Sequence, residues 1–362
     1  MGNKNNESVN PNEIFKCPGC GSNLKYDIDK QQMTCDFCGY SVNLSQTQKN
    51  EDHNFEDVEE EDDDRWTNTI RLAYCENCGA EVEVNSNDLS SKCPFCNTPM
   101  VVKEDSIKGM KPDKVIPFVV SQDIACTNYR TWIKKKFFAS IKVKKNIPNP
   151  SIYSTYIPSW TYDSQVFCTY KGRLGEDYQV RVGSGKDAHY ETRTRWFTIS
   201  GAYSLFADDI LVCSGQSITQ KEIQSLEPFN TNDSIDFDNH YLAGHTTEHY
   251  KKSVKLCWGV AKDRIYEMLR RGILARYSYD HIDYLNIYPV YKDTKYKYVI
   301  LPIWICHFEY NKTKYRFLVN GENGKISGKY PLSSLIISLI AVLVIALIIA
   351  IAFVVCKVIL GS

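Results

Sequence analysis

The feature that most constrains this chain is a repeated pattern of cysteine pairs near its N-terminus. Each copy has two cysteines separated by two residues, then fourteen residues, then a second such pair. The two sets are Cys17, Cys20, Cys35 and Cys38, and Cys75, Cys78, Cys93 and Cys96. Two residues between cysteines let one tight turn aim both sulfur atoms at a single ion, and two such turns complete a tetrahedral shell. The spacing predicts two small zinc ribbons of the β-hairpin type, over residues 13–44 and 71–103.

Disulfide formation is the alternative use of these cysteines, and the cellular compartment decides between the two. Residues 1–13 are polar and lack the apolar stretch of an export signal. We therefore expect a reducing compartment, where metal binding is favoured over disulfides. A unit of about 25 residues cannot build a sufficient core, so the metal supplies its folding free energy. We expect two structural Zn²⁺ ions, because four thiolates leave no coordination position for a catalytic water.

The remaining features of the ribbons concern turns and lone cysteines. Gly21, Gly39, Gly79 and Asn97 follow the second cysteine of each pair, where the turn needs a left-handed backbone. Six further cysteines stand singly, and we expect them to be small buried apolar residues. They are Cys126, Cys168, Cys213, Cys257, Cys306 and Cys356.

A long apolar run near the C-terminus predicts one transmembrane helix over residues 333–357. Leu335 to Val355 contains only aliphatic residues, Phe and one Ser, and as a helix it is about 31 Å long, enough to cross the hydrocarbon core. Basic residues precede this run, and Lys357 alone follows it. The preceding ones are Lys312, Lys314, Arg316, Lys325 and Lys329. The positive-inside rule then predicts a single-pass protein of the cell membrane with its N-terminal bulk in the cytoplasm.

Charge is distributed unevenly along a chain whose net charge is zero. The first 64 residues carry fifteen Asp and Glu against five Lys and Arg, whereas residues 65–330 are net basic. Residues 45–70 join the ribbons and include the acidic run Glu51–Asp64. We expect this linker to be a solvated, extended tether. The alternative is that it shields a basic surface on residues 65–330.

Residues 115–330 alternate apolar and polar positions and predict a β-rich α+β cytoplasmic domain. Within it we expect a helix at Ser121–Ala139, and a second at Asp238–Gly272 that is interrupted near Gly259. Lys314–Gly328 predicts a hairpin, because Asn-Gly supplies the positive φ angles of its turn.

A weaker repeat also lies in this domain. Tyr156-Ile-Pro-Ser-Trp160 is echoed by Ile300-Leu-Pro-Ile-Trp304. Two related halves with core-anchoring tryptophans would explain it.

Two clusters in this domain have competing interpretations. His240, His245 and His249, beside Asp236 and Asp238, are compatible with a metal-dependent hydrolase site, but we favour the face of a surface helix. The lysine-rich segment Trp132–Lys145 is compatible with an anionic membrane surface. We favour an amphipathic helix edge there, because Trp132, Ile133, Phe137 and Ile141 have core spacing.

Other function classes receive less support. The sequence contains no phosphate-binding loop, dinucleotide fingerprint or Ser/His/Asp order. We therefore expect neither an enzyme nor a small-molecule substrate. Neither ribbon has the basic stripe that phosphate contact requires, so nucleic acid is the second-ranked partner after membrane-associated proteins.

The ribbons, the segments YIPSWTYD, YLAGHTTEHY and LPIWICHFEY, the ending FLVNGENGKISGKYPLS and the terminal helix together resemble a known family. It comprises bacterial membrane-anchored zinc-ribbon proteins, also called transcription-factor-IIB-type or primosomal-helicase-like. Some relatives are encoded with homologues of phage-shock protein A. The resemblance implies an adaptor that recruits such membrane-remodelling proteins to the cytoplasmic membrane during envelope stress. It carries over residue by residue to the eight ribbon cysteines.

Overall fold

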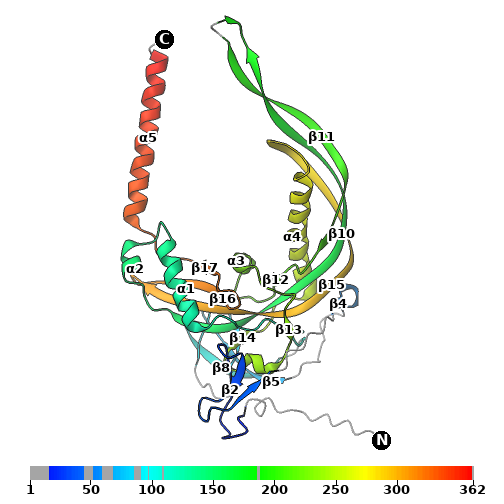
Figure 1. The fold of residues 1–362 in the computed structure, drawn as a ribbon, viewed down its shortest axis with the longest axis vertical. Helices are drawn as coiled ribbons and strands as arrows, with labels where there is room; N and C mark the ends of the chain where they lie inside the picture. The colour runs from blue at the N-terminus through cyan, green and yellow to red at the C-terminus, as the bar shows by residue number, and fades with distance from the viewer. Residues whose placement is uncertain are drawn as a thin grey trace.

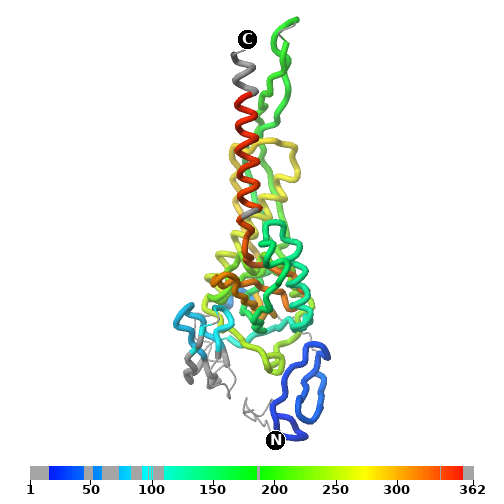
Figure 2. Tube along the Cα trace, turned by 90° about the vertical axis from the view of Figure 1, so that its left-hand side faces the viewer, coloured from blue at the N-terminus to red at the C-terminus, as the bar shows by residue number. Residues whose placement is uncertain are grey.

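The computed structural model describes residues 16–44, 52–58, 68–84, 91–96, 98–107, 110–185 and 188–360. A curved sheet forms the body, both ribbons lie at its lower end, and helix α5 (Ser334–Leu360) rises from its side (Figure 1). The two ribbons lie on opposite sides of this lower end (Figure 2). The expected combination of two four-cysteine units, a β-rich α+β body and one apolar C-terminal helix is therefore present.

The body is built on two long antiparallel strands, β10 (Ser151–Val182) and β15 (His281–Tyr310). They pair from Ser151 opposite His307 to Gly175 opposite His281, with irregularities that accompany their strong curvature. Strand β11 (His189–Ala207) pairs with the distal part of β10. We call Ser164–Val182 of β10, β11 and the facing part of β15 the arm, which extends far above the body (Figure 1).

The two repeated Pro–Trp segments lie opposite each other at the base of these strands. Pro158 pairs with Ile300, and Pro302 pairs with Tyr156, so the segments face each other about a local twofold axis. Both tryptophans are buried. The indole of Trp160 donates to the carbonyl of Lys252 at 3.0 Å, and that of Trp304 donates to a carbonyl at 2.8 Å. Each tryptophan thus attaches a separate loop to the sheet.

Helix α4 (Val254–Leu274) covers the concave face of the arm. Every fourth residue of its inner face is fully buried, as the periodicity of an amphipathic helix requires. These residues are Cys257, Ala261, Ile265, Leu269 and Ile273. Ser253 begins the helix, and its hydroxyl accepts a hydrogen bond from the amide of Leu256.

The predicted helix at Asp238–Gly272 is correct only in its second half. Residues 239–242 form a short 3-10 helix, η3 (Asn239–Leu242), and β14 (Thr246–Glu248) follows. Strand β14 pairs with β10 on one side and with a ribbon strand on the other, and this pairing overrides local helical preference. The helix also continues through Gly259 without a break.

The other predicted elements of the body are present with shifted ends. Helix α1 (Gln122–Lys135) stops before Ala139, and α2 (Ile141–Lys145) follows as a separate short helix. The predicted hairpin forms from β16 (Thr313–Asn320) and β17 (Ile326–Gly328). The remaining elements of the body are β9 (Lys114–Val115), β12 (Val212–Cys213), α3 (Gln220–Leu226) and β13 (Ile235–Asp236).

The ribbons differ in how they join the body. Ribbon 1 has its own three-stranded antiparallel sheet, formed by β1 (Lys25–Asp27), β2 (Gln32–Thr34) and β3 (Ser41–Asn43). Ribbon 2 extends the main sheet through four strands. These are β5 (Asn68–Tyr74), β6 (Glu81–Val84), β7 (Ser91–Lys92) and β8 (Pro99–Ile107).

Helix α5 is long and apolar enough to span a membrane. Its apolar stretch, Ile336–Phe353, has none of its residues buried against the rest of the protein. This stretch falls within the predicted range 333–357.

Candidate metal centres

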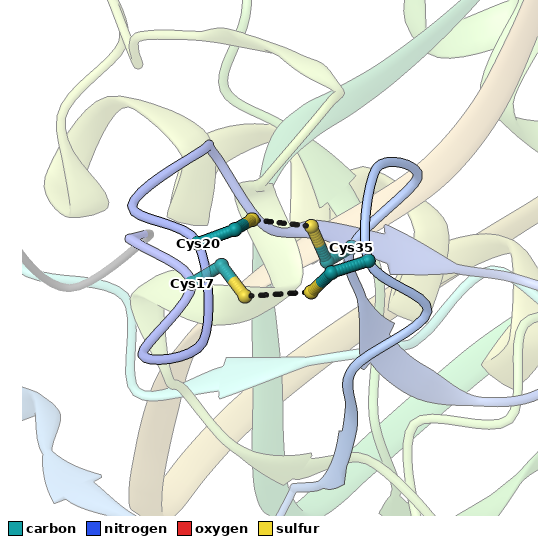
Figure 3. Close-up of side chains that lie close together, drawn as sticks. Cys17, Cys20 and Cys35 are labelled. Carbon is teal, nitrogen blue, oxygen red and sulfur yellow. Dashed lines mark hydrogen bonds between the residues drawn. The ribbon is translucent and has the colours of Figure 1, made fainter.

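The four cysteines of ribbon 1 converge on one point between two turns (Figure 3). The Sγ atoms of Cys17 and Cys38 lie 3.4 Å apart, and those of Cys20 and Cys35 lie 3.5 Å apart. Four thiolates around tetrahedral zinc, each about 2.3 Å from the ion, would lie about 3.8 Å apart. The sulfur positions therefore fit a single metal ion with a small outward adjustment.

The turns that present these sulfur atoms have the predicted backbone. Gly21, Gly39 and Gly79 have φ angles of 73°, 73° and 74°, which non-glycine residues rarely adopt. The amide of Gly21 donates to the carbonyl of Cys17 at 2.8 Å, which closes the first turn. Equivalent bonds close the turns at Gly39 and Gly79. Asn97, the fourth member of this set, lies outside the described residues.

Ribbon 2 repeats the arrangement. The Sγ atoms of Cys75 and Cys96 lie 3.4 Å apart, and those of Cys78 and Cys93 lie 3.6 Å apart. Cys75 and Cys93 are buried, as are Cys17 and Cys35 of the first set. In both ribbons the first cysteine of each pair thus faces the protein core.

The chemistry of these sites is that of closed metal centres. A hydrogen bond with the Ser22 hydroxyl, 3.0 Å away, is the main cause that lowers the pKa of Cys35 to about 6. A depressed thiol pKa favours the thiolate, which is the form that binds metal, whereas a hydrogen bond with Cys17 raises the pKa of Cys38 and burial raises the pKa of Cys78. With four sulfur ligands per site, either set can hold an ion and neither leaves a position for substrate.

Ribbon 1 packs against the body through an aromatic contact. Tyr26 lies edge-on against Tyr241, with ring centroids 5.1 Å apart, and its amide donates to the carbonyl of Ala243 at 3.1 Å. The side chain of Gln31 donates to the carbonyl of Phe118 at 2.7 Å. Ribbon 1 is therefore held on the body by backbone and core contacts.

Ribbon 2 is joined to the body by strand pairing. Strand β6 pairs with β14, with Val82 opposite Glu248. The ring of His307, in strand β15, lies 2.7 Å from the carbonyl of Pro94, the residue that follows Cys93. Lys251 also forms an ion pair with Glu81. The cysteine set of ribbon 2 is thereby connected to the central sheet.

The prediction that the acidic linker is a solvated, extended tether is wrong for part of it. Residues 52–58 are docked on the body. Strand β4 (His53–Asn54) pairs with β15, and η1 (Phe55–Asp57) follows it. The ring of Phe55 contacts Tyr162 and Trp258, with centroids 6.4 and 5.5 Å away. Apolar contact and strand pairing overcome the tendency of the acidic sequence to remain solvated. Glu51 lies outside the described residues, as do residues 59–67, which include six of the ten acidic residues of the run.

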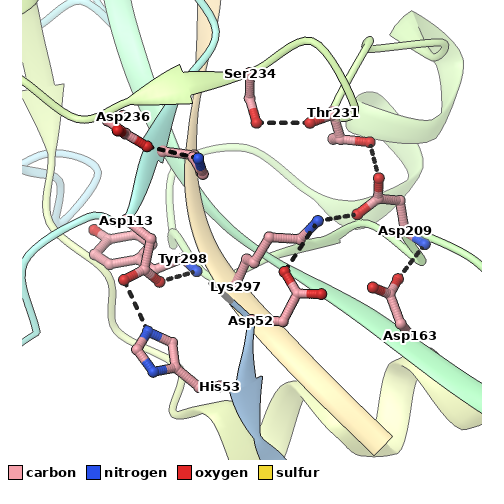
Figure 4. Close-up of polar contacts among 11 residues, drawn as sticks. Asp52, His53, Asp113, Asp163, Asp209, Thr231, Ser234, Asp236, Lys297 and Tyr298 are labelled. Carbon is pink, nitrogen blue, oxygen red and sulfur yellow. Dashed lines mark hydrogen bonds and ion pairs between the residues drawn. The ribbon is translucent and has the colours of Figure 1, made fainter. Parts of the chain in front are cut away.

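Charged groups accompany this docked segment (Figure 4). Lys297 lies 3.5 Å from Asp52 of the linker and 3.2 Å from Asp209 of the body. The backbone amide of Asp209 donates to Asp163 at 2.6 Å. Burial raises the pKa of Asp163 to about 6. His53 contacts Asp113 at 2.8 Å. Lys297 is one basic group that the docked linker meets; the alternative, in which the linker shields a basic surface on residues 65–330, stays a prediction.

The three histidines do not form a metal site. His240 contacts Asp238 at 2.6 Å, whereas His249 lies beside the ring of Tyr250. His245 stacks on Phe118, with centroids 4.8 Å apart, and neither ring nitrogen has a hydrogen-bond partner. Across the described residues, the clusters of Cys, His, Asp or Glu close enough to share an ion are the two cysteine sets. The favoured surface-helix interpretation is also wrong, since His245 and His249 flank β14.

The lone cysteines largely follow expectation. Those at positions 168, 213, 257 and 306 are buried, and Cys126 is half-buried. The side chain of Cys356 lies outside the described residues.

Sequence reasoning missed the roles of Tyr26, Phe55 and His245. An aromatic residue inside an acidic run, as at Phe55, was the available signal for docking.

Comparison with known proteins gives one similar chain. The uncharacterized protein YdjG of Bacillus subtilis strain 168 is 27% identical over 334 residues, which cover 88% of this chain and 90% of that protein. No protein-family model matches the chain, and no solved structure matches it. The similarity extends over most of both chains.

Proposed function

We propose that this protein is a membrane-anchored, zinc-binding adaptor that recruits protein partners to the cytoplasmic membrane. The observation that carries the proposal is the exposure of α5. Apart from Ser338, every residue of Ile336–Phe353 is apolar, and none of the stretch is buried in the body. Apolar surface in water costs roughly 25 cal/mol per Å², so lipid is the favourable surrounding for this helix. Under the positive-inside rule, the basic flank before it favours a body on the cytoplasmic side.

The two cysteine sets act as structural zinc centres in this proposal. Zinc suits four thiolates in tetrahedral arrangement, and the body holds both ribbons at its lower end, away from α5 (Figure 1). In this role the ions stabilise the surfaces that bind partners, and the protein catalyses no reaction.

Ribbon 1 carries an apolar surface of the kind that protein partners bind. Phe37, which lies between two metal-binding cysteines, is 84% exposed, and Tyr40 and Val42 are exposed beside it. Clustered exposed apolar residues are typical of protein interfaces, whereas nucleic acid requires a basic surface. This favours a protein partner over nucleic acid. The resemblance to known zinc-ribbon proteins suggests a coat-forming relative of phage-shock protein A as that partner.

Affinity purification of the tagged full-length protein from its own host tests the proposal. Membranes are solubilised gently, and co-purifying proteins are identified by mass spectrometry. We expect a specific membrane-associated protein that is lost with Phe37→Ser. The matched control is Phe206→Ser, which removes an equally apolar exposed residue from the arm. Absence of any protein partner contradicts the proposal, and recovery of salt-sensitive nucleic acid instead supports the second function, a membrane-tethered nucleic-acid binder.

A further inference from the structure

The chain between α1 and α2 is attached to the start of α5. The amide of Ser140 donates to the carbonyl of Pro331 at 2.9 Å, and the amide of Ser333 donates to the carbonyl of Phe138 at 2.8 Å. Ala139 and Leu332 form a β-bridge between these bonds. We call Lys134–Lys145 together with Leu332 the collar, because it adjoins the point where α5 leaves the body.

The collar exposes large apolar side chains. Phe137 is 69% exposed, and Phe138, Ile141 and Leu332 are 43%, 47% and 57% exposed. The sequence predicted Phe137 and Ile141 in the core, and this is wrong. Helix α1 ends at Lys135, so the helical spacing that would bury them is not continued. Four adjacent apolar groups facing outward require a covering surface.

The same collar is strongly basic. Its lysines are exposed or half-buried, and the sequence contains no Asp or Glu between Asp123 and Asp163. The collar lysines are Lys134, Lys135, Lys136, Lys142, Lys144 and Lys145. Exposed aromatic and aliphatic groups among lysines match the interface of an anionic bilayer, where the rings enter the headgroup region and the ammonium groups meet phosphates.

The position of the arm limits how the bilayer can lie. The arm and α5 extend toward the same end of the molecule (Figures 1 and 2). The arm carries charged pairs, such as Arg173 with Asp283 and Arg195 with Glu176, which are costly to place in hydrocarbon. A bilayer crossed by α5 therefore excludes the arm, and this requires α5 to tilt away from the arm beyond residues 331–333. The collar is bonded to these residues, so it stays beside the leaflet.

We propose that the collar is a docking surface for anionic lipid headgroups, which fixes the body on the cytoplasmic leaflet. This inference rests on the proposed membrane crossing of α5. Docking through the collar sets the tilt of the body, and with it the distance of the ribbons from the membrane.

Hydrogen exchange of the full-length protein in nanodiscs tests this docking. One disc contains phosphatidylcholine, and the other contains phosphatidylcholine with phosphatidylglycerol. We expect exchange in residues 136–146 to slow about fivefold or more in the anionic disc, since one lysine near such a leaflet contributes about 1 kcal/mol. The slowing should disappear at high salt, which screens exposed charges.

Matched triple variants assign the effect. Replacement of Lys142, Lys144 and Lys145 by Gln should abolish the lipid dependence. Replacement of three exposed lysines elsewhere by Gln should retain it. The control residues are Lys171, Lys221 and Lys262. Equal exchange in both discs, or equal loss with both variants, overturns the inference. A separate assay tests whether α5 crosses the bilayer. If it does not, alkaline carbonate extracts the protein from vesicles.

Discussion

Replacement of His245 by Phe should remove a specific part of the pH dependence of stability. His245 is in an aromatic environment, stacked on Phe118 and edge-on to Tyr156 and Tyr26. Its ring nitrogens have no hydrogen-bond partners. Burial lowers the pKa of His245 to about 4, because the charged imidazolium would lose hydration without gaining a counter-ion. The phenyl ring of the variant retains the stacking and cannot be protonated.

The expected size follows from proton linkage. Between pH 4 and 6.5 the unfolded chain binds a proton at this histidine and the folded protein does not, so stability falls as pH falls. Above pH 6.5 the histidine is neutral in both states, so protonation of the unfolded chain no longer lowers the free energy of unfolding. At pH 5.5, one unit below the ordinary histidine pKa, the loss is about 1.4 kcal/mol relative to neutral pH. The variant should therefore gain about 1.4 kcal/mol over the wild type when the pH changes from 7.5 to 5.5.

Urea unfolding in mild detergent micelles with excess zinc measures this difference. Tryptophan fluorescence follows unfolding of both proteins at the two pH values. Other groups that titrate in this range, such as His249 and Asp163, contribute equally to both proteins and cancel in the double difference. Competition between protons and zinc for the cysteines cancels in the same way.

The matched control is His189→Phe, at an exposed position on the arm. It should keep the pH dependence of the wild type. The reasoning is refuted if His245→Phe and the wild type lose the same stability between pH 7.5 and 5.5.

Three further predictions concern the attachment of the ribbons and the linker. Removal of zinc by a chelator should raise hydrogen exchange more in β1–β3 than in β6, because β6 retains its pairing with β14; equal increases would contradict this. Phe55→Ala should lower the free energy of unfolding by about 1–2 kcal/mol, less than for a fully buried ring, and raise exchange at residues 52–58. A stability change near zero would mean that the docked linker contributes no binding energy. Lys297→Met should lower the free energy of unfolding by roughly 3 kcal/mol or more, because it leaves Asp52 and Asp209 without their buried cation. Urea unfolding measures this loss, and an unchanged midpoint would refute it.

Local chemistry made part of this protein predictable from its sequence. The ligand sets, their glycine turns and the apolar C-terminal helix depend on residues close together in the chain. Metal geometry specifies the spacing of Cys17 and Cys20, and membrane thickness specifies the length of the terminal run. Helix α1 and the hairpin after Asn320 were also readable, since periodicity and turn residues act locally.

The tertiary structure decided how these parts are joined. The segment around His245 is predicted to be a helix, but pairing of β14 between β10 and β6 makes the three residues after His245 a strand. Phe55 lies in an acidic run, but the surface formed by Tyr162 and Trp258 binds it. Such outcomes depend on contacts between residues about a hundred or more positions apart, whose free energy exceeds local preference. The sequence by itself thus determined the two four-cysteine sets and the apolar helix, whereas long-range packing decided that ribbons, linker and body form one unit.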